Sequence, residues 1–260
     1  MNMREKMVAR FLAALAVALA LGALAFSRAQ AAGLDQSQAL FNQVLTTYVK
    51  DARVNYAALK AHPQALDRYL RQVAGVTEPE FNGWTRNPQL AFLINAYNAY
   101  TLRLILDHYP IKSIKDIGHF WRGPWDQPMV HLFGKTTTLN TLETQVRGYD
   151  EPRVHFALVC ASIGCPPLRS EPYVASRLNA QLNDQAKRFL ANRSKNRVDA
   201  ADQTVYLPPI FKWYAKDFER TSSSVLAFLR PYWPATPPAG YEHFTIRNTA
   251  YDWSLNEQTK

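Results

Sequence analysis

The stretch from Asn87 to Tyr109 constrains the fold more than any other part of the chain. Asn87 can cap a helix and Pro88 suits a first helical position, so the pattern predicts a helix that ends before Pro110. Its apolar residues cover most sides of the helix: Leu90, Phe92, Leu93, Ile94, Tyr97, Tyr100, Leu104 and Ile105. A helix of this kind needs neighbours all around it, so it is predicted to be central and largely buried.

Two asparagines, Asn95 and Asn98, lie on this apolar helix. Burying their amides is costly unless both are hydrogen-bonded. The pair therefore either holds neighbouring backbone or lines a functional site. The helix alone favours the structural role, and both alternatives stay open.

The rest of the chain alternates helical patterns with short hairpins. Helices are predicted at about Ser37–Lys50, Ala65–Val73, Ala175–Leu190, Ile210–Phe218 and Ser223–Leu229, hairpins at Val130–Leu139 and Arg197–Leu207, and an edge strand at Phe244–Arg247. Asn140 resembles a helix cap, with Glu143 reaching back to its amide. The strand–helix alternation of a doubly wound sheet is absent. The predicted fold class is α+β, a single helix-rich domain with a small, mostly antiparallel sheet.

The first 32 residues have the layout of a secretory signal peptide. A basic start is followed by an unbroken apolar run from Phe11 to Phe26, and small residues allow a cut near Ala31 or Ala32. The run is short for a bilayer span, which needs about twenty apolar residues. We therefore expect a signal peptide at 1–32, one domain at 33–260, no transmembrane span after signal removal, and a periplasmic or secreted location.

Charge and metal-binding residue types narrow the function classes. The formal net charge is +9, and it falls to +6 when residues 1–32 are removed, because they hold four basic residues and one acidic residue. The remaining charge is scattered, which is typical of a solvated surface rather than a polyanion-binding patch. Together with export, this argues against a nucleic-acid partner. The histidines and cysteines show no short metal-ligand spacing, so neither a metal nor a cofactor is expected.

The segment from Val154 to Pro167 holds both cysteines, Cys160 and Cys165, together with His155 and Ser162. The apolar run before Cys160 predicts a buried strand, and a glycine and two prolines then break regular structure. Reactive side chains on a loop after a strand are typical of an active site. In an oxidising compartment, the two cysteines can instead pair and pin a turn.

Short motifs span the predicted mature chain in a fixed order. They are Tyr48–Val49, Val54–Lys60, Gln89–Tyr100, Ile111–Ile114, Pro124–Asp126, Pro152–Leu158 with Cys160, Ser162, Cys165 and Pro166, then Ile210–Tyr214 and Tyr251–Ser254. This set resembles the DUF547 family, a domain of unknown function found in bacteria and plants. The resemblance implies no assigned activity. Some plant relatives join the domain to a coiled coil and look like interaction proteins, whereas this chain has no heptad run.

The first functional hypothesis is an exported module for ligand or partner binding, or for scaffolding. Its pocket would surround the segment His155–Pro166, with a structural Cys160–Cys165 disulfide, and its partner would be a small molecule, a peptide or an envelope protein. His155, Arg153 and Asp126 would satisfy buried backbone and one another. The candidate binding residues are Asn98, Tyr97, Arg153, Ser162, Cys165, Trp125 and Asp126.

The alternative is a thiol-dependent hydrolase or transferase. Cys160 would be the nucleophile and His155 the base, with Asn95, Asn98 or Glu143 as the orienting group, because a reactive thiolate needs a base and a polar partner. Residues five apart on a straight strand face opposite sides, which is a geometric objection to the pair. His119 and His131 are the alternative bases. A thiol–disulfide role is less favoured, since the spacing is not that of a CxxC motif. Whether the protein is an enzyme stays open at this stage.

Overall fold

The computed structural model describes residues 35–119 and 121–259, and the predicted signal peptide at 1–32 lies outside them. Residues Gln36–Lys260 form one compact unit. Within the described residues, no helix is long and apolar enough to cross a membrane.

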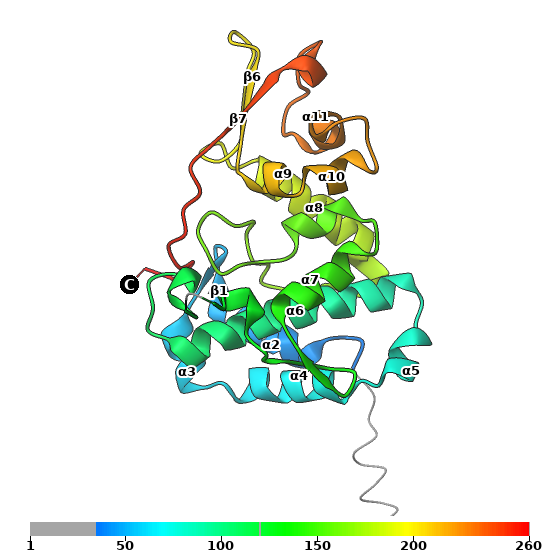
Figure 1. Ribbon diagram of the computed structural model, residues 1–260, viewed down its shortest axis with the longest axis vertical. Helices are drawn as coiled ribbons and strands as arrows, with labels where there is room; N and C mark the ends of the chain where they lie inside the picture. The colour runs from blue at the N-terminus through cyan, green and yellow to red at the C-terminus, as the bar shows by residue number, and fades with distance from the viewer. Residues whose placement is uncertain (1–34, 120, 260) are drawn as a thin grey trace, which may run out of the picture. The chain divides into compact units, whose positions relative to one another are not determined.

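Helix α6 (Arg86–His108) is the central helix that the sequence predicts, and nearly all of its residues from Leu90 to Leu106 are buried. It packs between α4 (Gln64–Gly75) and α7 (Leu139–Arg147) (Figure 1). Its N-cap is Thr85 rather than Asn87, so the helix begins slightly earlier than predicted and Pro88 still falls in the first turn, where no backbone N–H is needed.

The other helices are shorter, and they lie partly around α6 and partly over a second core. They are α2 (Ala39–Tyr48), α3 (Tyr56–Ala61), α5 (Glu78–Asn82), α8 (Leu178–Leu190), α9 (Ile210–Trp213), α10 (Ala215–Glu219) and α11 (Val225–Leu229). The predicted helix Ile210–Phe218 is thus broken in two at Tyr214. The prediction that Asn140 caps a helix is wrong. Thr138 is the cap of α7, because its hydroxyl accepts the Thr141 N–H, and Asn140 lies inside the first turn.

The strands form three small sheets. Two are antiparallel hairpins, β1 (Val49–Lys50) with β2 (Arg53–Val54) and β3 (Val130–Leu132) with β4 (Lys135–Thr137). The third has the order β5 (Arg197–Asp199), β6 (Thr204–Leu207), β7 (Thr245–Asn248), and only β6 and β7 pair in parallel. The predicted α+β class with mostly antiparallel pairing is confirmed, with the strands distributed over three sheets.

The predicted strand at Val154–Val159 is wrong. Pro152–Phe156 forms the 3-10 helix η3, and irregular backbone follows it. The run is buried as expected, but its neighbours are the helices α6 and α8 rather than another strand. Side-chain amides provide the hydrogen bonds that a neighbouring strand would have given this backbone. Asn98 bonds the Ala157 carbonyl and the Val159 N–H, both at 3.0 Å, and Gln185 donates to the Phe156 carbonyl at 2.9 Å.

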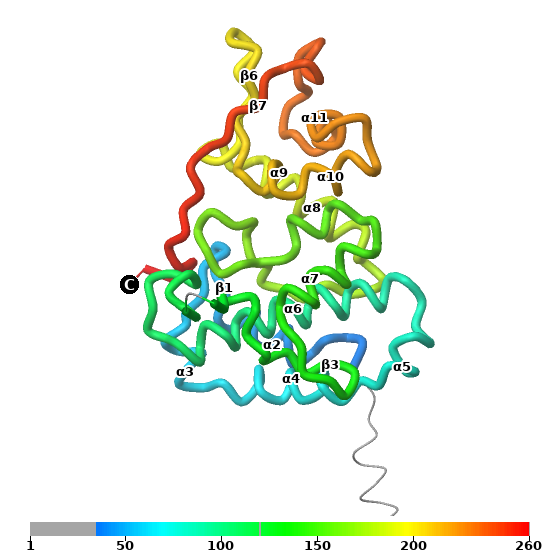
Figure 2. The backbone as a smooth tube through the Cα atoms, viewed as in Figure 1, coloured from blue at the N-terminus to red at the C-terminus, as the bar shows by residue number. Residues whose placement is uncertain are grey.

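After β7 the chain returns to the β1–β2 hairpin (Figure 2). Val54 exchanges backbone hydrogen bonds there with Asn256 and Gln258, at 2.9 and 3.0 Å. On the way, the segment 251–256 pairs with the loop 160–165, which we call the cysteine loop. Gly164 is needed at this contact, because a Cβ atom there would lie 2.8 Å from the Tyr251 ring. The two ends of the unit thus fix the cysteine loop from one side.

A second core lies beyond α6, under α8 to α11. Four phenylalanines form its centre, with neighbouring ring centroids 5.4 to 6.0 Å apart: Phe156, Phe189, Phe211 and Phe218. Phe156 lies four residues before Cys160, so this cluster anchors the chain that leads into the cysteine loop.

Candidate functional site

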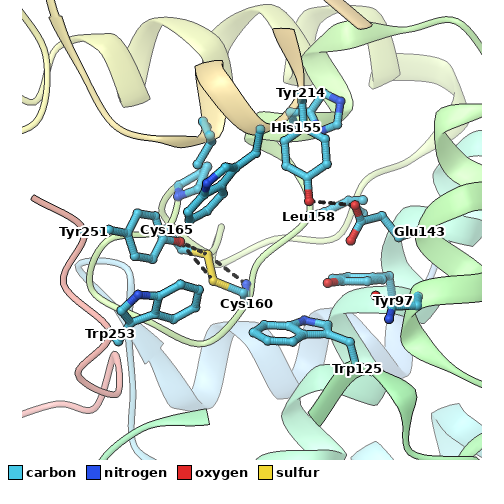
Figure 3. Close-up of a pocket in the computed structure, with 14 residues that line it drawn as sticks. Tyr97, Trp125, Glu143, His155, Leu158, Cys160, Cys165, Tyr214, Tyr251 and Trp253 are labelled. Carbon is cyan, nitrogen blue, oxygen red and sulfur yellow. Dashed lines mark hydrogen bonds between the residues drawn. A yellow bond between two sulfur atoms is a disulfide. The ribbon is translucent and has the colours of Figure 1, made fainter. Parts of the chain in front are cut away.

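A cavity of about 320 Å³ opens beside the cysteine loop (Figure 3). Six aromatic side chains contribute to its walls: Tyr97, Trp125, Trp213, Tyr214, Tyr251 and Trp253. They come from α6, from the 3-10 helix Pro124–Asp126, from the α9–α10 break and from the C-terminal segment. The aromatic walls alone therefore depend on four chain segments that are distant in sequence.

The aromatic rings contact one another around the opening. Trp253 lies 4.5 Å from Tyr251, 6.0 Å from Trp213 and 6.1 Å from Trp125, measured between ring centroids. Trp213 is 50% exposed, so part of its ring faces solvent at the entrance. Mutual packing of this kind fixes ring orientations, which favours a preformed aromatic surface.

Cys160 and Cys165 are joined as a disulfide that lines the cavity, with their Cα atoms 6.2 Å apart. The hydroxyl of Tyr251 lies 3.1 Å from one sulfur and 3.2 Å from the other, and the Ser162 hydroxyl lies 3.2 Å from the Cys160 sulfur. The Cys160 N–H donates to the Cys165 sulfur at 2.9 Å. In this oxidised form, neither sulfur is a nucleophilic thiolate.

Among the residues that the structure describes, Glu143, on α7, is the one carboxylate in the cavity lining. The Tyr214 hydroxyl donates to its Oε1 at 2.8 Å, while its other oxygen faces the cavity (Figure 3). Burial raises the pKa of this carboxyl, against the opposing effects of the Tyr214 hydrogen bond and Arg147. The prediction that Glu143 reaches back to the Asn140 amide is wrong, because Thr138 provides the cap and Glu143 turns toward Tyr214.

His155 lies at the back of the cavity, where its ring stacks on Tyr214 with centroids 4.0 Å apart. Its Nε2 is 2.8 Å from Asp217, which also accepts from Arg147 Nε at 2.7 Å. Burial lowers the pKa of His155 to about 4, although the Asp217 carboxylate acts in the opposite direction. The neutral ring donates from Nε2 because a carboxylate only accepts. Its bonded partner is therefore Asp217 rather than Cys160.

The structure brings together only part of the predicted site. Tyr97, Trp125, His155 and the two cysteines line the cavity, and Ser162 touches the disulfide from behind.

The predicted site residues Asn95 and Asn98 lie outside the cavity lining. Asn95 bonds the Tyr173 N–H and carbonyl, at 2.9 and 2.7 Å, and Asn98 bonds the segment after η3. Both amides hold backbone, which is the structural role that the apolar helix favours.

Arg153 and Asp126 also lie outside the cavity lining. Arg153 pairs with Glu151 and bonds two asparagines of α8, whereas Asp126 accepts from Asn140 at 2.5 Å. The expectation that His155, Arg153 and Asp126 satisfy one another is wrong, since each has a different polar partner.

Sequence reasoning did not assign four of the wall residues to the site: Trp213, Tyr214, Tyr251 and Trp253. The aromatics of 210–218 are predicted as core, which holds for Phe211 and Phe218 but not for the half-exposed Trp213. The usable signal is that Trp213–Tyr214 and Tyr251–Trp253 belong to the same ordered motif set as the cysteine loop.

The polar groups of the cavity are few, and most are already hydrogen-bonded. In residues 35–119 and 121–259, no group of three or more His, Cys, Asp or Glu side chains could hold a metal ion. The arrangement offers aromatic faces, one buried carboxylate and a disulfide wall. These features suit the binding of an apolar or cationic group.

Fold and site together define an α+β domain with an aromatic cavity closed by a disulfide-linked loop. The family model described as "Protein of unknown function, DUF547" matches residues 81–190 of the chain, which supports the resemblance to that family over this segment. That segment includes Tyr97, Trp125, Glu143, His155 and the cysteine loop, whereas the walls from α9–α10 and the C-terminal segment lie beyond it. No curated protein and no solved structure matches the chain.

Proposed function

We propose that this domain is an exported binding module that takes a small organic ligand, or one side chain of a peptide, into the aromatic cavity. The observation that carries the proposal is the cavity of about 320 Å³ with six aromatic residues and one buried carboxylate in its lining. Ligand sites are typically concave, mostly apolar, and of roughly 300–1,000 Å³, with a few placed polar groups. A disulfide wall fits an oxidising compartment.

The cavity is built to stay open without a ligand. Its floor is tied to α6 through Asn98, and its C-terminal wall is tied to the cysteine loop by backbone hydrogen bonds such as Ile163 to Ser254 at 2.8 Å. Preorganised walls reduce the ordering cost of binding.

The test is a ligand panel read by tryptophan fluorescence and thermal shift, because three tryptophans line the cavity. A ligand found in the wild type is expected to lose at least tenfold in affinity in Trp213→Leu. Trp121→Leu is the matched control, since this side chain is 87% exposed and is not among the cavity walls. An equal loss of affinity in both variants, or an unchanged affinity in Trp213→Leu, would reject the cavity as the binding site.

Thiol chemistry is the second candidate, a hydrolase or transferase that uses Cys160 with His155. The observation in its favour is that the Tyr251 and Ser162 hydroxyls lie within hydrogen-bonding distance of the Cys160 sulfur, where they would stabilise a thiolate after reduction. The bond between His155 and Asp217 speaks against a direct base role. Binding and thiol chemistry are distinguished by counting free thiols, with alkylation and intact-mass measurement in the absence of reductant. A free Cys160 with an apparent pKa well below about 8.5 favours the enzyme, and a protected pair favours binding.

A further inference from the structure

We propose that the cavity is a receptor for organic cations, with a quaternary ammonium or similarly alkylated amine as the group that enters it. This inference rests on the proposed binding function and names its ligand class. It is carried by the combination of ring faces, one carboxylate without an ion-pair partner among the described residues, and lining hydroxyls that are mostly hydrogen-bonded within the protein.

The ring faces are the first element of the argument. A cation over an aromatic face is attracted by the ring quadrupole, most strongly over tryptophan. Trp125, Trp213 and Trp253 meet at the opening, and Tyr251 packs on Trp253 at 4.5 Å. The protein itself uses this interaction here, because Lys115 Nζ lies 5.0 Å from the Trp253 ring centroid.

The carboxylate is the second element. One oxygen of Glu143 accepts from Tyr214, and the other faces the cavity (Figure 3). In the described part of the chain, no lysine or arginine forms an ion pair with Glu143, and none lines the cavity. Arg147, the nearest candidate on the same helix, is paired instead with Asp217 through two nitrogens at 2.7 and 3.3 Å. An entering cation would therefore meet a carboxylate without a competing partner.

The third element argues against a ligand that depends on many hydrogen bonds, such as a sugar. The hydroxyl of Tyr214 is bound to Glu143, and that of Tyr251 lies within hydrogen-bonding distance of the disulfide. Asn140 Nδ2 donates to Asp126. A sugar would leave its hydroxyl groups without partners in such a cavity, and buried polar groups without partners are costly. An alkylated ammonium group has few or no hydrogen bonds to lose.

The charges around the cavity favour a cation over an anion. On the side of α7 and α10, Glu143 is unpaired while Arg147 is balanced by Asp217, and His155 is neutral at pH 7. Close to the cavity, the 3-10 helices Ile114–Asp116 and Pro124–Asp126 contribute one basic residue, Lys115, and two acidic residues, Asp116 and Asp126. The remaining uncompensated charge inside the lining is the Glu143 carboxylate.

The experiment compares choline with the neutral alcohol in which a carbon atom replaces the quaternary nitrogen. The two have nearly the same shape, so their difference isolates the charge. The purified protein is titrated with each compound at pH 7.5, and binding is followed by tryptophan fluorescence and calorimetry. Choline is expected to bind at least tenfold more tightly than the neutral alcohol. Benzyltrimethylammonium, which adds a ring for the tryptophans, is expected to bind more tightly than choline.

Glu143→Gln is the matched variant, because glutamine keeps the shape and can still accept from Tyr214. It is expected to weaken choline binding at least tenfold and to change binding of the neutral isostere less than threefold. Glu151→Gln is the control, since Glu151 pairs with Arg153 and is not part of the cavity lining. If Glu143→Gln fails to fold, as judged by circular dichroism, the choline–isostere ratio in the wild type still decides.

The outcomes separate the two proposals. Isostere binding equal to or tighter than choline binding overturns the cation assignment while leaving an aromatic binding cavity. If the Glu143→Gln variant still prefers choline to the isostere and the Trp121→Leu variant does not, the cation binds elsewhere, and the assignment to this cavity is overturned. If neither cation nor isostere nor any member of the wider panel binds, the proposed function itself fails.

Discussion

Two cavities lie against the same cysteine loop and differ in chemistry. The first is the aromatic cavity with Glu143, of about 320 Å³. The second, of about 380 Å³, has no aromatic cluster and includes three basic side chains: Arg53, Arg188 and Lys195. Cys165 and Pro166 contribute to both. One loop thus serves as a wall for two environments.

The difference comes from the segments that approach each side of the loop. Helices α6, α7 and α9 bring Tyr97, Glu143 and Trp213 to the first cavity. Hairpin residue Arg53 and the end of α8 bring basic groups to the second, where Lys195 donates to the Ile163 and Cys165 carbonyls. The cysteine loop forms a wall of both cavities, and the neighbouring segments determine whether each cavity is aromatic or basic. Variants that affect the loop should therefore change both cavities, and variants on one side should change one.

The largest effect is expected from Asn98→Ala. It leaves the Ala157 carbonyl and the Val159 N–H buried without partners, at a cost to the free energy of unfolding of about 4 kcal/mol, from ~2 kcal/mol per group. Because this segment leads into the shared loop, binding in the first cavity should also weaken. Urea denaturation and ligand titration are the measurements.

Asn95→Ala is the matched control for that variant. It removes an equivalent pair of backbone bonds, to Tyr173, which lines neither cavity. A similar loss of stability with unchanged ligand affinity is expected. If Asn95→Ala lowers affinity as much as Asn98→Ala, the loop is not the element that couples stability to the cavity.

His155 is expected to make the protein sensitive to acid. Its pKa is lowered to about 4 from 6.5 by burial, so the unfolded chain binds the proton first as pH falls. The stabilisation is complete above pH 6.5 and is lost between there and pH 4. At 1.36 kcal/mol per pKa unit, the free energy of unfolding should fall by about 3 kcal/mol in this window.

Denaturation at several pH values in this window tests the assignment to His155. His155→Asn keeps a donor toward Asp217 but has no titrating ring, so its stability should depend less steeply on pH than that of the wild type. Parallel curves for the two proteins would contradict the role of His155.

Reduction of the disulfide should affect both cavities at once. Closing a loop of about six residues stabilises a protein by about 2 kcal/mol in the chain-entropy account. Cys160→Ser with Cys165→Ser should lower the free energy of unfolding by about that amount and weaken binding in the first cavity. Wild type treated with a dithiol reductant is the companion sample. Full affinity in both samples would show that the loop keeps its shape without the bond.

The elements with strong periodicity could be predicted from the sequence. Helix α6, the hairpins β3–β4 and β5–β6 and the α+β class follow from local patterns. The segment after Pro152 could not be assigned locally, because a buried apolar run is compatible with a strand or with backbone held between helices. The decision came from Asn98 and Gln185, which are distant in sequence and satisfy its polar groups.

About half of the site could be predicted, because local sequence patterns identify some of its residues and miss the others. The cysteine loop, Tyr97 and Trp125 were identified because reactive or aromatic residues stand in short motifs. Glu143 has a local explanation as a capping residue, which hid its contact with Tyr214. Trp213 and Trp253 lie side by side in the cavity wall because the C-terminal segment packs against the cysteine loop. No local sequence pattern predicts that packing.

The smallest effect is expected from Lys195→Gln, which tests whether the two cavities are independent. Burial lowers the pKa of Lys195 to about 8, so the amine is still charged at pH 7 but loses its proton more readily than in the unfolded chain. The wild type should therefore gain stability as pH rises from 8 toward 10.5. Glutamine loses the bonds to the Ile163 and Cys165 carbonyls but also removes the charge, so the net change at pH 7 should be below about 1 kcal/mol. Choline affinity in the first cavity should change less than twofold. A larger change, measured by the same fluorescence titration, would mean that the basic side of the loop controls the aromatic side, and the two cavities would have to be treated as one site.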